Sequence, residues 1–402
     1  MSFLKKIIKK LLLIFSDLFF PEYRFHNKFN ATIIGNDAQS MSSNCHYFVG
    51  YYDIDPVSKD SKDLLCHKVS GDYTNDILPL EGEIGLLSIK TNEFKKLANT
   101  KALNWQLGSR VQWLDDSHII YNDISNDFHV SRKLNIHTKD IIKEYPRSFW
   151  AISPNKKLSA SLNFSRIRQK RPGYGYKGKS IDGDQEVFSI FNLESGKDEV
   201  KFNLQEILNN IEYNLDGEDP YLNHVAWSPC SSKLLTIFHI AEQKNLPRRI
   251  YPVLFDLLSQ SWSILDDSGF FSHHVWIDSN NLLAYKSVDN KKNYYLRNSN
   301  NEWTRINIGM SKKDGHPSPV INGTDIIHDE YPNKLGIMKL NIGSINNTQK
   351  HRTIGYIKNP PEYNGPIRCD LHPRVSKDNT KVICDMPTKL GRRILVIEGN
   401  YA

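Results

Sequence analysis

The sequence predicts an all-β fold, a seven-bladed β-propeller, from three observations. One short phrase recurs seven times along the chain, the strand-like segments are short and rich in aromatic and β-branched residues, and long periodic helices are lacking beyond the N-terminus. The clearest copy of the phrase spans residues 368–384. It runs from a polar, histidine-bearing lead-in through apolar positions and a turn into a short apolar strand, as one blade of a propeller would.

The seven copies repeat this order with variations. Their lead-ins begin at Tyr52, Arg110, Trp150, His224, His274, His316 and Arg368. The strands after the turns are expected at 64–67, 118–121, 158–162, 234–238, 281–285 and 324–328, and at the end of the 368–384 copy. The lead-ins lie roughly 40 to 75 residues apart, and propeller repeats have periods of about 40 to 50. We therefore expect one propeller domain over residues 46–399.

The longest spacing between copies contains a basic, glycine-rich stretch at 166–176, followed by a predicted short helix at 204–211. Insertions of this kind map to surface loops, often on the functional face. We interpret the arginines and the lysine of 166–171 as a solvated loop. The alternative is a loop beside the channel mouth that attracts an anionic glycan or a phosphate.

Charge and cysteine content limit the class of function. The formal net charge of +7 over 402 residues is modest, and charges of both signs are scattered. No basic stripe is interleaved with base-stacking aromatics, so nucleic-acid binding is not indicated. The five cysteines show neither paired spacing nor a CxxC motif. This pattern predicts reduced thiols and favours a cytoplasmic location.

Residues 1–22 predict a basic amphipathic helix. Apolar residues from Leu4 to Leu18 recur on one helical face, and the lysines between Lys5 and Lys10 lie largely on its flank or opposite side. We expect this helix to lie on the membrane surface, with its lysines facing anionic lipids. The alternatives are a helix docked on the propeller and an uncleaved secretion signal.

Function is expected where the seven lead-ins meet, because the innermost strand of every blade lines one central channel. The candidate side chains at this ring are Tyr51, Tyr52, Asp53, Arg110, His224, His273, His274, His316, Arg368, Asp370, His372 and Arg374. Because they share a phase of the repeat, residues far apart in the sequence should converge there.

Four blades carry histidine at or next to the same phase. These histidines are His224, His274 with His273 beside it, His316 and His372. Three or four neutral imidazoles that converge in a channel can hold a divalent transition metal such as Mn or Zn, or act as acid and base near neutral pH. The alternative is that each histidine hydrogen-bonds the next blade for structural reasons.

Arginines and tyrosines add to the ring. Arg110, Arg368 and Arg374 supply fixed cations, and a guanidinium fork pairs well with a carboxylate or a phosphate. The alternative is that one or two of them bridge blades through Asp53 or Asp370. Adjacent residues of a strand point to opposite faces, so one of Tyr51 and Tyr52 should face the channel, where it could stack on a sugar ring or donate a proton.

Three motifs resemble those of bacterial seven-bladed propellers related to the oligogalacturonate lyases and ulvan lyases. They are Gly50-Tyr51-Tyr52-Asp53, His316-Pro317-Ser318 and Arg368-Cys369-Asp370-Leu371-His372-Pro373-Arg374. The chain is also similar to propellers encoded among genes for capsule and lipopolysaccharide O-antigen synthesis. The resemblance covers most of residues 46–399.

In the lyase relatives a uronate loses the proton alpha to its carboxylate and expels the 4-linked oxygen by β-elimination, which needs a cation, a base and a proton donor. The resemblance implies metal binding or base action by His224, His274, His316 and His372. It implies that Arg110 or Arg374 clamps the carboxylate and that Tyr52 is the proton donor. Substrate contacts are expected from Tyr51, Asp53, His273, Arg368 and Asp370.

These inferences lead us to expect a cytoplasmic, peripheral membrane protein of capsule or O-antigen biosynthesis. It would bind or process an anionic glycan or its lipid-linked precursor. The alternatives are a true polysaccharide lyase and a non-catalytic scaffold for membrane glycosyltransferases. Whether the chain is an enzyme is left open by the sequence.

Overall fold

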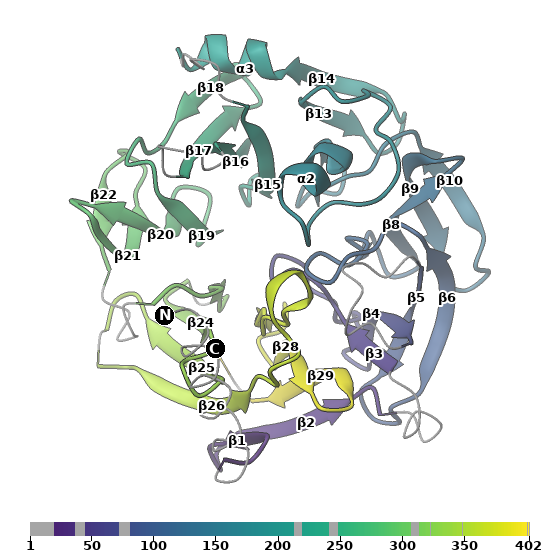
Figure 1. Cartoon of the computed structure of the whole chain (residues 1–402), viewed down its shortest axis with the longest axis vertical. Helices are drawn as coiled ribbons and strands as arrows, with labels where there is room; N and C mark the ends of the chain where they lie inside the picture. Colours follow the sequence, from purple (N-terminus) through teal and green to yellow (C-terminus); the bar gives the residue numbers. More distant parts are fainter. Residues whose placement is uncertain are drawn as a thin grey trace, which may run out of the picture. The chain divides into compact units, whose positions relative to one another are not determined.

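The predicted all-β, seven-bladed β-propeller is confirmed by a computed structural model (Figure 1). The structure describes residues 20–36, 45–71, 81–212, 219–240, 248–306, 313–321, 323–347, 349–399 and 401. Its described strands form seven antiparallel sheets, of which six have four strands and one has five. The chain divides into two compact units, which we call the terminal unit (1–99 and 307–402) and the middle unit (100–306).

The terminal unit contains three of the sheets, in the strand orders β3-β4-β5-β6, β2-β29-β28-β27 and β1-β26-β25-β24-β23. Its elements are β1 (Tyr23–Phe25), β2 (Asn30–Ile34), β3 (Cys45–Phe48), β4 (Asp63–Ser70), β5 (Gly82–Ser88), β6 (Phe94–Thr100), β23 (Ser318–Pro319), β24 (Asp325–Glu330), β25 (Ile337–Ser344), β26 (Arg352–Lys358), the 3-10 turn η2 (Gly365–Ile367), β27 (Arg374–Val375), β28 (Lys381–Thr388) and β29 (Gly391–Glu398).

The middle unit contains four sheets, formed by β7 to β10, β11 to β14, β15 to β18 and β19 to β22. Its elements are β7 (Gln112–Trp113), β8 (His118–Ser125), β9 (Phe128–Asn135), β10 (Ile141–Tyr145), β11 (Ala151–Ile152), β12 (Leu158–Ser161), α2 (Phe164–Lys170), β13 (Val187–Asn192), β14 (Asp198–Asn203), α3 (Leu204–Asn210), β15 (Tyr221–Trp227), β16 (Lys233–Ile240), β17 (Arg249–Asp256), β18 (Ser261–Ile264), β19 (Phe271–Trp276), β20 (Leu282–Val288), β21 (Lys291–Arg297) and β22 (Trp303–Arg305).

The seven predicted strands that follow the turns all exist, as β4, β8, β12, β16, β20, β24 and β28. Most residues of these strands are buried, as expected where both faces of a blade are covered by neighbouring blades. In β28, every residue after the first is buried. The core clusters of the terminal unit accordingly combine side chains of two adjoining sheets, such as Leu340 of β25 and Leu395 of β29.

The lead-in phase of the repeat has a backbone signature. Arg110, His224 and His372 occupy equivalent places before the apolar strand, and all three have positive φ, of 59°, 63° and 46°. At His224 the pairing between β15 and β16 shifts register, so this residue is bulged. Because left-handed backbone costs a residue with a side chain about 1 to 2 kcal/mol, its recurrence indicates a conformation that the blade imposes.

The sheets begin earlier than the expected start at residue 46. β2 pairs with β29 and so completes the last blade from the N-terminal side, while β1 adds a fifth strand beside β26. The blade that carries β27 and β28 is therefore built from both ends of the chain. Pairing with β2 satisfies the backbone hydrogen-bonding groups at the outer edge of β29. The last blade therefore cannot be completed without the segment that contains β2.

The basic, glycine-rich insertion lies between β12 and β13 of one sheet and is more ordered than the expected loop. α2 begins after Asn163, whose side chain accepts a hydrogen bond from the backbone N–H of Arg166, and its buried residues are Phe164 and Ile167. Asn163 is thus a favourable N-cap residue directly before the arginine-rich sequence. The short helix predicted at 204–211 is confirmed as α3, which starts with a capping box between Asn203 and Glu206.

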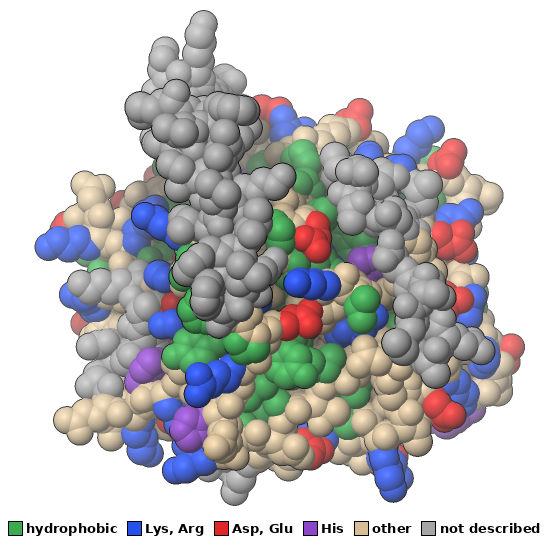
Figure 2. Space-filling view, turned by 60° about the horizontal axis from the view of Figure 1, so that its bottom comes forward, with side chains coloured by type: hydrophobic (Ala, Val, Ile, Leu, Met, Phe, Trp, Pro, Cys, Tyr) green, Lys and Arg blue, Asp and Glu red, His purple; other side chains and the backbone are tan. Residues whose placement is uncertain are grey.

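Charges of both signs are interspersed on the face shown in Figure 2, as the composition predicts. The predicted amphipathic helix lies outside the described residues up to residue 19, and only 20–22 of that segment are described. In the part of the chain that the structure describes, we find no helix with the length and apolar character needed to span a membrane.

Packing of the closing strand β2 should be measurable. Ile34 is 2% exposed and belongs to a core cluster with Tyr47 and Val396. We expect Ile34→Ala to lower the free energy of unfolding by about 2 to 5 kcal/mol, because it removes a buried side chain and leaves a cavity. The exposed Thr32 of the same strand gives the matched control, Thr32→Ala. Equal urea midpoints for the two variants would contradict the described packing of β2.

The five cysteines are free, as predicted, and differ in reactivity. Hydrogen bonds from Ser228 and Ser232 lower the pKa of the exposed Cys230 thiol to about 6, whereas burial raises the pKa of Cys369 to about 12. The thiolate is the nucleophile. We therefore expect iodoacetamide to modify Cys230 alone in the folded protein, at a rate that rises as pH increases through about 6. Peptide mapping should show no labelling of Cys230→Ser, and comparable labelling of a buried cysteine would refute this assignment.

Candidate functional site

Three predicted residues of the terminal unit come together at the lead-ins of β23 and β27. The rings of His316 and His372 have their centroids 4.3 Å apart and stand nearly perpendicular, at 86°. Ligand atoms of His316, Asp370 and His372 all lie within 4.8 Å of one another, and the three residues are buried. We call these three residues the His-Asp group.

Asp329, on β24, orients His316. Its carboxylate oxygens lie 2.9 and 3.0 Å from Nδ1 of His316, and Oδ1 also accepts the backbone N–H of His316 at 2.7 Å. A carboxylate is an acceptor here, so Nδ1 of His316 carries the hydrogen and Nε2 holds the ring's lone pair. This carboxylate–imidazole pairing is the usual arrangement behind a metal-binding histidine.

The close approach of the chain to Asp329 requires glycine at position 315. A Cβ atom built on Gly315 would lie 1.9 Å from the carbonyl oxygen of Asp329. The same aspartate accepts the backbone N–H of His372 at 3.3 Å. Asp329 therefore holds the lead-ins of two sheets through one side chain.

His372 is oriented by a backbone carbonyl. Its Nδ1 lies 2.7 Å from the carbonyl oxygen of Gly50, which accepts only, so Nδ1 carries the hydrogen. Its Nε2 is buried and has no hydrogen-bond partner in the described structure, with Asp370 Oδ2 the nearest acid at 4.0 Å. An unpartnered lone pair at this depth is costly, and a bound cation would satisfy it.

The two imidazoles differ in their electrostatics. Burial opposes the charge on His316, but the carboxylates of Asp329, Asp370 and Asp314 outweigh it and raise the pKa of this histidine. Burial, aided by His316 and Arg374, holds the pKa of His372 well below its usual value. His372 is therefore neutral at physiological pH, in the protonation state that a metal ligand needs.

The carbonyl of Gly50 is itself fixed by a buried ion pair. Asp385 of β28 accepts the backbone N–H groups of Val49 and Gly50 at 2.8 and 3.0 Å. Arg374 lies 3.2 Å from Asp385 through Nη2, donates to the carbonyl of Gly50, and donates through Nε to the carbonyl of Tyr51 at 3.0 Å. Nε and Nη2 of Arg374 are thus bound by groups of the protein itself. The role of Arg374 as a carboxylate clamp stays a prediction.

Tyr51 and Tyr52 both lie against the His-Asp group. Their ring centroids are 4.7 Å apart, Tyr51 is 5.0 Å from His372, and Tyr52 is 5.2 Å from His316. The expectation that they point to opposite faces is wrong, because residues 51–53 form a turn and not a strand. Asp53 follows them and is exposed.

Arg368 marks the more open side of the His-Asp group. Its Nε donates to Oδ2 of Asp370 at 2.8 Å, and its side chain is 28% exposed against 5% for Asp370. The guanidinium thus balances the charge of the buried carboxylate while it reaches toward solvent. This placement suits the predicted role of Arg368 in contacting an anionic substrate.

The remaining predicted residues belong to the middle unit. Arg110 is 1% exposed and donates through Nε to the carbonyl of Trp150 at 2.7 Å. His224 lies 5.1 Å from the Trp150 ring. His274 is buried with Nδ1 3.1 Å from the carbonyl of Ser272, and His273 is half-buried. Metal or substrate roles for these residues stay predictions.

Sequence reasoning did not single out Asp329 or Asp385. Asp385 lies between Cys384 and Met386 in an otherwise apolar run, and Asp329 lies in the polar second half of β24, so neither position matched the histidine-bearing phase of the repeat. A signal was available in the sequence. A lone aspartate in a strand buried on both faces needs hydrogen-bond donors, and this requirement points to a structural or orienting role.

The His-Asp group fits a divalent first-row metal. Two imidazoles and one carboxylate are ligands that Mn and Zn accept, and three protein ligands leave coordination positions for water or substrate. Nδ1 of each imidazole is hydrogen-bonded to the protein, which leaves Nε2 for a metal. The buried Nε2 of His372 has no hydrogen-bond partner among the described residues. Asp370, expected to contact substrate, belongs to this candidate metal group.

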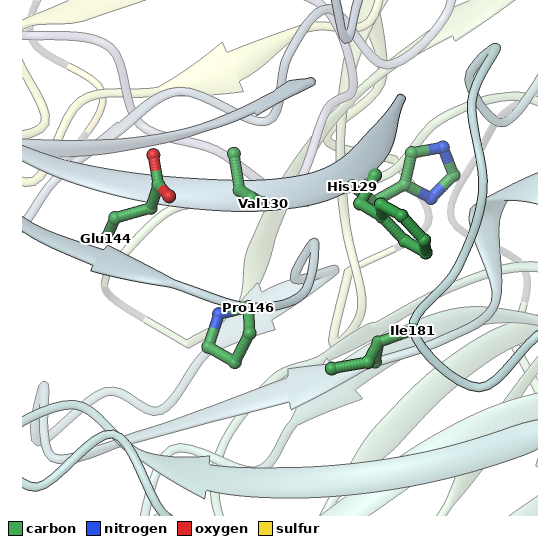
Figure 3. Close-up of a pocket in the computed structure, with 6 residues that line it drawn as sticks. His129, Val130, Glu144, Pro146 and Ile181 are labelled. Carbon is green, nitrogen blue, oxygen red and sulfur yellow. The ribbon is translucent and has the colours of Figure 1, made fainter. Parts of the chain in front are cut away.

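The middle unit contains a hollow of about 370 Å³ lined mainly by apolar groups, between β9, β10 and the loop at Ile181 (Figure 3). Nε2 of His129 lies 2.7 Å from the carbonyl of Lys177, and burial lowers the pKa of this histidine to about 4. Glu144 is bound by Arg132 at 2.9 Å. The titratable groups of this hollow are thus neutral or paired, so we do not assign the chemistry to it.

Comparisons with known proteins show the fold. No protein-family model matches the chain, and no curated protein matches it. Among solved structures, it is similar to an oligogalacturonate lyase from Vibrio parahaemolyticus, with a TM-score of 0.60 and 13% identity over 92% of this chain and 97% of that one. It is also similar to an oligogalacturonate lyase in complex with manganese, with a TM-score of 0.62 and 10% identity over 92% and 96%.

Metal binding by the His-Asp group can be tested directly. We expect the metal-stripped protein to bind Mn²⁺ in isothermal titration, and His372→Ala to abolish this binding because it removes the unpartnered nitrogen. Asp329→Asn should weaken it about 10- to 100-fold, the usual effect of losing the carboxylate behind a histidine ligand.

His137→Ala provides the control, since this exposed histidine lies in the middle unit. Circular dichroism establishes that each variant is folded. Unchanged Mn²⁺ binding by a folded His372→Ala protein would remove the His-Asp group as a metal site.

Proposed function

We propose that this propeller is a metal-dependent, carbohydrate-active protein that eliminates across uronate linkages of an anionic glycan. The observation that carries the proposal is the His-Asp group, in which two imidazoles are held in one tautomer by Asp329 and Gly50. A metal with open coordination positions is what a uronate carboxylate needs as a partner.

The structural comparisons support this direction. Both similar structures are described as oligogalacturonate lyases, and one of them is in complex with manganese. At 10 to 13% identity these likenesses show the fold alone. We carry the metal and the substrate class over to this chain as part of the proposal, because its own residues form a group that suits them.

The proposed reaction is a β-elimination. The proton alpha to the uronate carboxylate leaves to a base, the bond to the 4-linked oxygen breaks, a double bond forms in the sugar, and the departing oxygen gains a proton. A bound divalent metal would neutralise the uronate carboxylate and so make the alpha proton more acidic. His316, Asp370 and His372 would hold the metal. Asp329 accepts the hydrogen on Nδ1 of His316, so the lone pair on Nε2 remains available to the metal.

Tyr52 is the proposed proton donor. Its ring contacts the rings of His316 and Tyr51, so its position is fixed relative to the His-Asp group. Of the two candidate arginines in the terminal unit, Arg368 is better placed to bind the uronate, because it is partly exposed while Arg374 is 2% exposed. Arg374 instead fixes the loop that carries Gly50 and the tyrosines.

A second candidate is a role in capsule or O-antigen assembly, in which the glycan is bound at the cytoplasmic membrane face and is not cleaved. The basic amphipathic pattern of residues 1–22 favours it. Next to that segment, Phe20 and Tyr23 are each 44% exposed and Arg24 of β1 is exposed, so apolar and basic side chains are accessible there as well. In this setting the lipid surface and membrane glycosyltransferases would be the partners.

The lyase proposal has a direct assay. With Mn²⁺ and a uronate-rich polysaccharide, we expect an unsaturated product that absorbs in the ultraviolet, and its loss on chelation. His372→Ala should remove activity together with metal binding. Tyr52→Phe should lower kcat about 10²- to 10⁴-fold while metal binding persists, because a positioned acid contributes that much to proton transfer.

Tyr23→Phe is the matched control for the phenol, since Tyr23 is exposed on β1. Full activity of Tyr52→Phe would contradict its assigned role. Metal-dependent binding of the glycan with no product, across a broad panel of uronate polymers, would refute the lyase and favour the assembly role.

A further inference from the structure

A second cluster of charged groups lies in the middle unit, and the proposed function does not use it. It is formed by Arg171, at the C-terminal end of α2, Arg248, directly before β17, and His239 of β16, together with two tyrosine rings. We call these residues the arginine cluster. All of them lie within the middle unit, and the cluster contains none of the residues of the His-Asp group.

α2 packs beside β15, the strand that begins with Tyr221 of the arginine cluster. Figure 1 shows α2 beside β15, and a guanidinium nitrogen of Arg166 donates to the carbonyl of Pro220 at 2.9 Å, directly before this strand. The backbone N–H of Arg171 closes the helix by donating to Ile167 at 2.8 Å. Lys170, the last residue of α2, also pairs with Asp219, so the end of the helix directly before Arg171 lies next to the start of β15.

Aromatic rings hold the two arginines. The Cζ atom of Arg171 lies 4.1 Å from the centroid of the Tyr174 ring. Arg248 lies with Nη2 2.9 Å from Nδ1 of His239, whose ring stacks on Tyr221 at 5.1 Å and 16°. Tyr174, Tyr221 and His239 are buried, while Arg171 is half-buried and Arg248 is exposed. The cluster thus has a fixed floor and an open side.

His239 contributes a further donor. A guanidinium can only donate, so Nδ1 of His239 accepts from Arg248 and the hydrogen of the neutral ring sits on Nε2. Burial and the charges of Arg171 and Arg248 hold the pKa of His239 well below its usual value, consistent with a neutral ring. Two guanidinium groups and one imidazole N–H are therefore available as donors.

Among the residues that the structure describes, the arginine cluster carries an excess of positive charge. Within the described residues no carboxylate pairs with Arg171 or Arg248, whereas Arg166 and Lys170 of the same helix both pair with Asp219. Burial and the nearby charge of Arg171 lower the pKa of Arg248. Two like charges held close together without a counter-charge are destabilising, and an anion between them would relieve the repulsion.

We propose that the arginine cluster is a binding site for the anionic group of a ligand, a carboxylate or a phosphate of an acidic sugar. Guanidinium forks match both groups in geometry and charge. The site does not depend on a metal. Failure of the metal or lyase proposals therefore leaves it standing, and its own failure leaves them standing.

The test uses the full chain, kept in a chelator so that no metal contributes. Galacturonate, inorganic phosphate and neutral galactose are titrated separately by calorimetry. We expect saturable binding of at least one of the two anions and none of galactose, and weaker binding at higher salt because part of the attraction is screened. Preference for galacturonate would identify a uronate ligand, and preference for phosphate would identify a phosphorylated one.

Arg171→Gln and Arg248→Gln should each weaken binding of the preferred anion about tenfold, since each removes a charge-assisted hydrogen bond. Arg305→Gln is the matched control, because it removes one exposed positive charge from β22 of the same unit. Should Arg171→Gln lose its fold in circular dichroism, Arg248→Gln decides, as its side chain is exposed.

Two results would overturn the proposal. One is the absence of saturable binding of either anion by the unmodified chain. The other is an affinity in folded Arg248→Gln protein equal to that in Arg305→Gln, which would mean that the attraction comes from net charge and not from the arginine cluster.

Discussion

The carboxylate of Asp329 is the interaction on which the candidate metal group depends. It accepts the Nδ1 hydrogen and the backbone N–H of His316, and the backbone N–H of His372. Burial of a lone carboxylate is costly, and three N–H donors offset that cost. Because the donors belong to the lead-ins of two sheets, one side chain fixes both imidazoles relative to each other. The ligands are thereby preorganised by the fold itself.

Asp329 is a specialised form of a device that the fold uses elsewhere. It is the fifth residue of β24, and the fifth residues of β28 and β8 are Asp385 and Asn122. Asp385 accepts two backbone N–H groups of 49–50, and Asn122 bonds both the N–H and the carbonyl of Phe149. In each case a polar side chain in a buried strand forms hydrogen bonds to the backbone of a segment beside another sheet. We call these contacts latches. Asp329 differs because it also accepts an imidazole, and this addition favours function over a purely structural role.

The repeats, the seven apolar strands and α3 could be predicted because turn residues and local alternation encode them. The shared phase also brought His316 and His372 together with Asp370. The latches were not predictable in this way. The Asp385 contact to Val49 spans 336 residues, and the fifth strand position varies between aspartate and asparagine. Long-range partners of single polar residues leave no local pattern, so only the packed structure reveals them.

The two units differ in the charge of the ligand that their candidate sites would attract. In the terminal unit the ligand atoms of the His-Asp group are a carboxylate and imidazole nitrogens, which attract a cation. In the middle unit the arginine cluster presents the guanidinium groups of Arg171 and Arg248, which would attract an anion directly. We therefore expect a glycan carboxylate to bind beside the His-Asp group through a metal or through Arg368, whereas binding to the arginine cluster would need no metal. Chelation should separate the two modes of binding, and this separation follows from the charges alone.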